Sequence, residues 1–107
     1  MISNNNTNNW ESKMLEFTMK SKGALNIVFT SKTVLEITDI EPSCVHCTRV
    51  AGYNKSTKEL TLVFKPGKFP VHLALEGKKF YISKKFVTIT YSNGTREELW
   101  FNVRVEK

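Results

Sequence analysis

The chain has 107 residues, enough for one domain with its own hydrophobic core and too few for two. A hydrophobic content of 40% excludes a disordered chain, and no apolar run approaches the roughly 18 residues that a membrane-spanning helix needs. The formal net charge of +6 favours an acidic partner, and residues 54–107 carry the whole excess, with 11 basic and 5 acidic side chains.

Residues 3–9 are polar and rich in asparagine. We therefore expect residues 1–9 to form a flexible arm and residues 10–107 to form the single domain. The arm has no basic segment followed by an apolar stretch, which a secretory signal would show. We accordingly expect the protein to stay in the cytoplasm or to leave the cell by lysis.

From residue 14 onward the dominant hydrophobic period is two, the period of a half-buried β-strand. Apolar and polar side chains alternate in seven runs, at residues 14–19, 25–30, 35–38, 59–64, 69–76, 86–91 and 98–105. Turn-forming pairs such as Pro66-Gly67 and Glu76-Gly77 separate most of these runs. Between the last two runs, Asn93-Gly94 predicts a type I′ turn and therefore an antiparallel hairpin.

Short antiparallel strands with one apolar and one polar face predict an all-β, immunoglobulin-like antiparallel sandwich of about seven to nine strands. We expect less than about 10% helix, because no window shows a helical period over two turns. The expected core contains Leu15, Phe17, Leu25, Ile27, Leu35, Ile37, Leu60, Leu62, Phe64, Val87, Ile89, Leu99, Phe101 and Val103.

Cys44-Val45-His46-Cys47 allows three interpretations. A redox motif should begin a helix, yet the residues that follow are β-prone. A zinc site needs two further ligands, and His72 is the only histidine outside this motif. We favour a structural role, with the two cysteines half-buried at a strand end and either reduced or bridged.

The sequence contains no catalytic motif, phosphate-binding loop or dinucleotide-binding turn. Asp39 is the only aspartate, and no pair of carboxylates has a spacing that indicates acid–base chemistry. We therefore expect a non-enzymatic protein that needs no cofactor and no metal.

The candidate binding site is a lysine-rich segment that contains Lys65, Lys68, Lys78, Lys79, Lys84 and Lys85. Aromatic residues interleave with these lysines, and Phe80, Tyr81 and Phe86 are the ones that the alternation leaves free to stack on nucleic acid bases. Arginine, which base-reading proteins prefer, is scarce in the chain. The segment allows three interpretations: a solvated lysine face without a partner, a face that binds an acidic protein surface, and a face that binds nucleic acid. Of the two partners, we favour protein over nucleic acid.

Residues 37–48, Ile-Thr-Asp-Ile-Glu-Pro-Ser-Cys-Val-His-Cys-Thr, resemble the signature of a bacterial Ig-like domain family related to the hydin-type domains. In that family an apolar strand leads into Ser-Cys-Gly-Cys-Thr. The similarity continues at residues 60–64, 85–91 and 99–105. Here the cysteines are spaced Cys-x-x-Cys, and residues 69–76 look like an added strand.

The resemblance implies a sandwich fold and a binding role, and it brings no catalytic residues. Free-standing domains of this type are common as auxiliary, decoration-type proteins of tailed-phage virions. Our leading hypothesis is therefore a protein that docks on a phage capsid or tail through protein–protein contacts. The alternatives are a bacterial envelope or adhesion module and a small basic nucleic-acid-binding protein.

Overall fold

The computed structural model describes residues 9–107, which form two sheets and one short helix. One sheet has the strand order β1-β7-β6-β3 and the other has the order β2-β5-β4. The elements are β1 (Met14–Lys20), β2 (Leu25–Thr30), β3 (Ile37–Pro42), β4 (Thr48–Asn54), β5 (Glu59–Phe64), α1 (Val71–Leu75), β6 (Phe80–Tyr91) and β7 (Arg96–Glu106).

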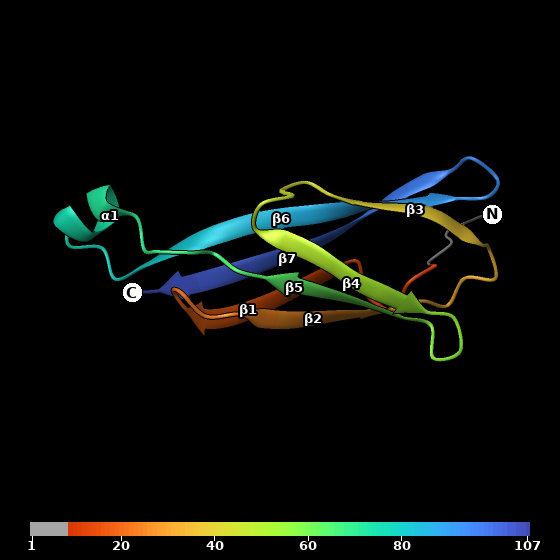
Figure 1. The fold of residues 1–107 in the computed structure, drawn as a ribbon, viewed down its shortest axis with the longest axis horizontal. Helices are drawn as coiled ribbons and strands as arrows, with labels where there is room; N and C mark the ends of the chain where they lie inside the picture. The colour runs from red at the N-terminus through yellow and green to blue at the C-terminus, as the bar shows by residue number, and fades with distance from the viewer. Residues whose placement is uncertain (1–8) are drawn as a thin grey trace, which may run out of the picture.

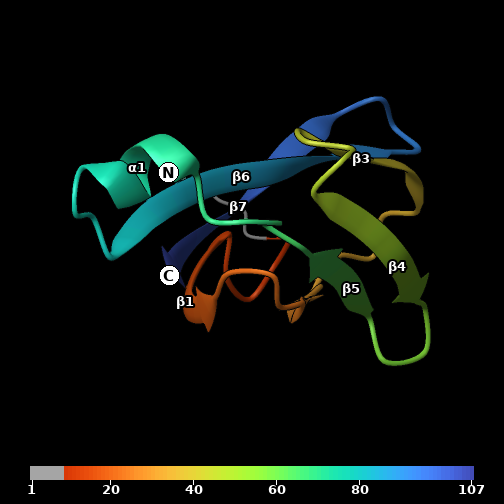
Figure 2. The same ribbon diagram turned by 60° about the vertical axis from the view of Figure 1, so that its left-hand side comes forward.

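The two sheets pack on each other, and α1 lies beyond one end of them, at the same end as the C-terminus (Figures 1 and 2). The predicted all-β sandwich is confirmed. The arm predicted for residues 1–9 lies, apart from Asn9, outside the described residues.

The longest pairing in the molecule is the hairpin of β6 and β7, in which Phe80 lies opposite Glu106 and Thr90 opposite Arg96. The predicted antiparallel pairing is confirmed, but the predicted type I′ turn is wrong. Gly94 has a φ of 86°, whereas Asn93 does not adopt a positive φ. The Gly94 N–H donates to the Tyr91 carbonyl at 2.9 Å, and a three-residue loop ending in a left-handed glycine makes the reversal.

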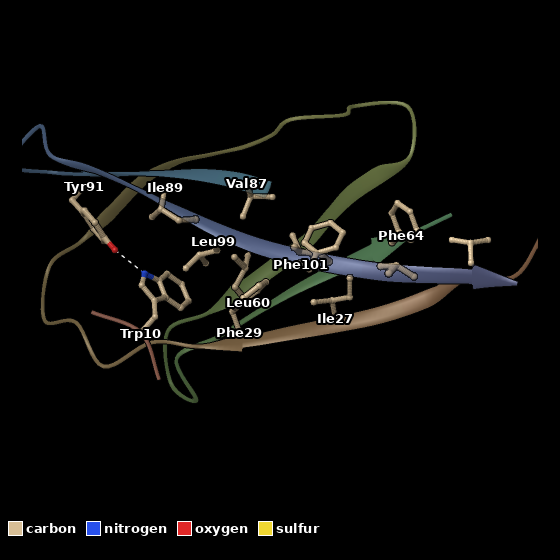
Figure 3. Close-up of a cluster of buried hydrophobic side chains, with 13 residues drawn as sticks. Trp10, Ile27, Phe29, Leu60, Phe64, Val87, Ile89, Tyr91, Leu99 and Phe101 are labelled. Carbon is tan, nitrogen blue, oxygen red and sulfur yellow. Dashed lines mark hydrogen bonds between the residues drawn. The ribbon is translucent and has the colours of Figure 1, made fainter. Parts of the chain in front are cut away.

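The core lies between the sheets, where side chains from both inner faces interdigitate (Figure 3). The Phe64 and Phe101 rings bridge the two sheets edge to face, with centroids 5.7 Å apart. The fully buried apolar side chains are Trp10, Ile27, Phe29, Leu60, Leu62, Phe64, Val87, Ile89, Tyr91, Leu99, Phe101, Val103 and Val105. Five residues of the expected core are only partly buried at its margin, namely Leu15, Phe17, Leu25, Leu35 and Ile37.

Several segments differ from the expected strands: β6 begins at Phe80 instead of residue 86, β3 covers Ile37–Pro42 instead of residues 35–38, and two further differences are larger. Residues 69–76 were predicted to form a strand, but residues 71–75 form α1. Pro70 has no N–H for a strand ladder and is compatible with a helix start, and Gly77, with a φ of 81°, ends the helix. Residues 48–54, outside the predicted runs, form β4, and a bulge between Val50 and Gly52 explains why the alternation is hidden there.

A buried hydrogen-bond network fixes the start of the domain to the β6–β7 hairpin. The Trp10 indole N–H donates to the Tyr91 hydroxyl at 2.7 Å (Figure 3), and that hydroxyl donates to the Glu97 carboxylate. The Asn9 amide and the Lys13 ammonium also donate to Glu97, at 2.8 and 3.1 Å. Burial alone would raise the pKa of Glu97, but these hydrogen bonds and the charge of Lys13 outweigh it and hold the pKa below 4.5.

Stability should therefore depend on pH through Glu97. Because its pKa is lower in the folded than in the unfolded state, its contribution is complete above pH 4.5 and is lost as the pH falls through the folded-state pKa. We expect Glu97→Gln to lower the free energy of unfolding at pH 7 by about 1–3 kcal/mol and to weaken its dependence on acidic pH. Urea unfolding between pH 7 and pH 3 measures both effects.

The exposed neighbour Glu98 provides the control, because Glu98→Gln makes the same change in net charge as Glu97→Gln but lies outside the network. A Glu97→Gln variant with the pH profile of the parent would contradict this description of the network.

Candidate functional site

The candidate site is a cleft of about 590 Å³ at the end of the sandwich that carries α1. Five basic side chains line it, and we call them the basic pole: Lys20, Lys78, Lys79, Arg104 and Lys107. Phe80 and Glu106 also line the cleft.

Strand pairing brings these residues together from three distant parts of the sequence. The parallel pairing of β1 with β7 places Lys20 beside Glu106, and the antiparallel pairing of β6 with β7 places Phe80 on the other side of Glu106. Beyond the strand ends, the Lys107 N–H donates to the Lys79 carbonyl at 2.9 Å. The cleft is therefore a product of the four-stranded sheet.

The cleft carries a strong excess of positive charge. Its single carboxylate, Glu106, already lies 3.7 Å from the Lys20 ammonium and 3.4 Å from the Arg104 guanidinium. Within residues 9–107, no carboxylate lies within ion-pair distance of Lys78, Lys79 or Lys107. These uncompensated charges on one wall make the cleft suited to an anionic group.

The six lysines predicted to form a patch lie in several places. Lys78 and Lys79 line the cleft, and Lys84 lies on the outer face of β6 in an adjacent hollow that Arg104 also borders. Lys85 is half-buried and lies opposite Phe101. Lys65 and Lys68 are exposed after β5, where Lys65 borders the cysteine loop.

Sequence reasoning missed Lys20, Arg104 and Lys107. No local signal marks them, because only the pairing of β1, β7 and β6 brings them to Lys78 and Lys79.

The aromatic rings that were expected to be free already have partners. The Arg104 guanidinium lies over the Phe80 ring, with its Cζ atom 3.7 Å from the ring centroid. Tyr81 turns inward and meets Phe69 edge to face at 5.6 Å, and Phe86 packs on Trp100 at 4.6 Å. A base that stacked on any of them would have to displace or share an existing contact, which weakens the case for single-strand binding.

The Cys44 and Cys47 side chains are joined by a disulfide in the connection between β3 and β4. The loop is also closed by the Thr48 N–H, which donates to the Cys44 carbonyl at 3.0 Å. Strand β4 follows the second cysteine, so the motif does not begin a helix. This position, where the chain passes from one sheet to the other, agrees with the structural interpretation.

No family model matches the chain, and the searches of curated proteins and of solved structures found no match either. In the described part of the chain, no helix has the length and apolar character needed to cross a membrane. Likewise, residues 9–107 bring together no group of three metal-binding side chains.

A structural disulfide predicts a modest effect of its removal. The Cys44→Ser, Cys47→Ser double variant should fold and lose roughly 2 kcal/mol of stability or less, because the bridge closes only a four-residue loop. Denaturant unfolding of the variant, and of the parent kept in excess reductant, should give similar midpoints. An unfolded double variant would contradict this modest contribution to stability, and a thiol in the reduced parent titrating well below about 8.5 would favour redox chemistry.

Proposed function

We propose that this protein is a non-enzymatic binding module that docks on an acidic protein surface through its basic pole. The observation that carries the proposal is the cleft, in which Lys78, Lys79 and Lys107 have no carboxylate partner among residues 9–107. Such a concentration of charge at one end of a small domain attracts and orients an anionic partner.

Two features favour protein over nucleic acid as the partner. The aromatic rings near the lysines are engaged with Arg104, Phe69 and Trp100 rather than free to stack on bases. In addition, α1 leads into Lys78 with Val71 and Leu75 72% and 83% exposed. Exposed apolar side chains beside charged ones are typical of protein interfaces, which combine an apolar centre with a polar rim.

We further infer that the sandwich is immunoglobulin-like. The orders β2-β5-β4 and β7-β6-β3 match the B-E-D and G-F-C orders of immunoglobulin domains, while β1 lies beside β7 instead of beside β2. The resemblance of residues 37–48 to a bacterial Ig-like family supports the same class. This combination favours an auxiliary protein of a phage virion, which would fix itself to a larger protein assembly.

The docking proposal predicts a localised charge effect. Lys78→Glu with Lys79→Glu should weaken binding to fluorescein-labelled poly-L-glutamate roughly fivefold to thirtyfold, because each reversed lysine contributes about 0.5–1 kcal/mol. Fluorescence anisotropy at two salt concentrations measures the change, and binding of the parent should weaken with salt. The fold should be unaffected, since both lysines are exposed.

The control is Lys32→Glu with Lys55→Glu, two exposed lysines in loops that follow β2 and β4. It makes the same change in net charge away from the cleft, and we expect a much smaller effect. Equal losses in the two double variants would contradict a localised site. Tight, salt-sensitive binding of a single-stranded oligonucleotide at physiological salt would favour nucleic acid instead.

A further inference from the structure

The outer face of the four-stranded sheet carries a row of apolar side chains where water would favour polar ones. Trp100 on β7 lies between Met14 on β1 and Phe86 on β6, as their direct neighbour in the strand register. Met14 is 48% exposed, and Ile82, further along β6 on the same face, is 50% exposed. Contiguous exposed apolar side chains on a sheet face mark a contact surface.

Charged side chains on this face are distributed unequally about the row. Toward the basic pole lie Lys20, Lys84 and Arg104, with Glu16 and an already paired Glu106. On the other side of the row lie Asp39, Glu41 and Glu98, with Arg96. The apolar row therefore separates a basic half from an acidic half of the same face.

We propose that two copies of this chain pack these outer faces together about a twofold axis that runs across the strands, along the row of Met14, Trp100 and Phe86. That axis makes the strands of the two copies antiparallel and places the basic half of each face on the acidic half of the other. An isologous interface requires this kind of self-complementarity. The arrangement with parallel strands brings like charges together, so the charges select the antiparallel one.

The size of the face fits such an interface. Each residue covers about 3.3 Å along its strand and about 4.8 Å across to the next strand, so the 36 residues of the four strands cover roughly 570 Å². A standard protein–protein interface covers about 800 Å² on each partner and a weak one less than about 600 Å², so this face has the size of a weak, reversible interface. The aromatic pair Phe86–Trp100 lies at its centre, where binding energy concentrates in protein interfaces.

The row lies closer to the start of β7 than to its end, since Trp100 is nearer in sequence to Arg96 than to Glu106. An antiparallel pair centred on the row therefore leaves Lys78, Lys79 and Lys107 of each basic pole, which lie beyond the strand ends, overhanging at opposite ends. The dimer presents two docking ends, and two linked sites bind a repetitive acidic surface more tightly than one.

The test is the mass of the protein in solution, measured by sedimentation equilibrium from about 1 µM to about 1 mM, a range that brackets weak interfaces. We expect a reversible dimer of twice the monomer mass of 12.3 kDa. Trp100→Lys should raise the dimer dissociation constant roughly thirtyfold or more. Met14→Lys, on the edge strand β1, is a second variant in case Trp100→Lys disturbs the fold.

Val28→Lys is the matched control, because Val28 is 43% exposed on the outer side of β2 in the other sheet, and it should leave the mass unchanged. The orientation is tested by Glu41→Lys, which should weaken the dimer, and by adding Lys84→Glu, which should restore it. A parent that stays monomeric throughout this range overturns the proposal. So does a dimer that Val28→Lys dissociates while Trp100→Lys and Met14→Lys do not.

Discussion

The register of the β6–β7 hairpin is the constraint on which the other features of this protein depend. Phe86 lies opposite Trp100, and Val87 lies opposite Leu99. Because side chains alternate between the two faces of a strand, this register puts Val87 and Leu99 in the core and puts Phe86 and Trp100 on the outer face. A slip of one residue would exchange the two sets, exposing the core and burying the charges.

The same hairpin organises both ends of the molecule. At the turn end, Trp10 donates a hydrogen bond to Tyr91, and Asn9 and Tyr91 both donate to Glu97. These hydrogen bonds hold the start of the domain in place. At the other end, Phe80 and Glu106 close the pairing, and Lys107 bonds to Lys79 next to the cleft. Strand β1 then joins β7 in parallel and adds Lys20 to the basic pole. The core, the hydrogen-bond network at the start of the domain and the cleft are therefore all consequences of the β6–β7 pairing.

Local patterns predicted those parts of the fold that depend on local chemistry. The alternation of Leu60, Leu62 and Phe64 identified a core strand, and the burial of all three follows from it. The burial of Trp10 could not be predicted in this way, because it depends on a hydrogen bond to Tyr91, 81 residues later. The prediction for residues 69–76 was wrong for a local reason. The five residues of α1 are too few for their apolar spacing to distinguish a strand from one helical turn, and only Pro70 and Gly77 indicate the helix.

The candidate site divides in the same way. Lys78 and Lys79 stand out in the sequence as part of a lysine-rich segment, but Arg104 and Lys20 gain their place only through strand pairing. The lysines that were grouped by sequence separate in space, because neighbouring residues of a strand point to opposite faces, as Lys84 and Lys85 do.

The most direct test of this account is the register itself, measured by NMR contacts between α-protons across the hairpin. The N–H of Tyr91 bonds to the carbonyl of Thr95, so the alternation of an antiparallel ladder makes Phe86 and Trp100 a non-hydrogen-bonded pair with closely approaching α-protons. We predict a strong α-proton contact between Phe86 and Trp100 and another between Lys84 and Asn102. Contacts that instead join Phe86 to Leu99 or to Phe101 would contradict it, because the core and the outer face would then be exchanged.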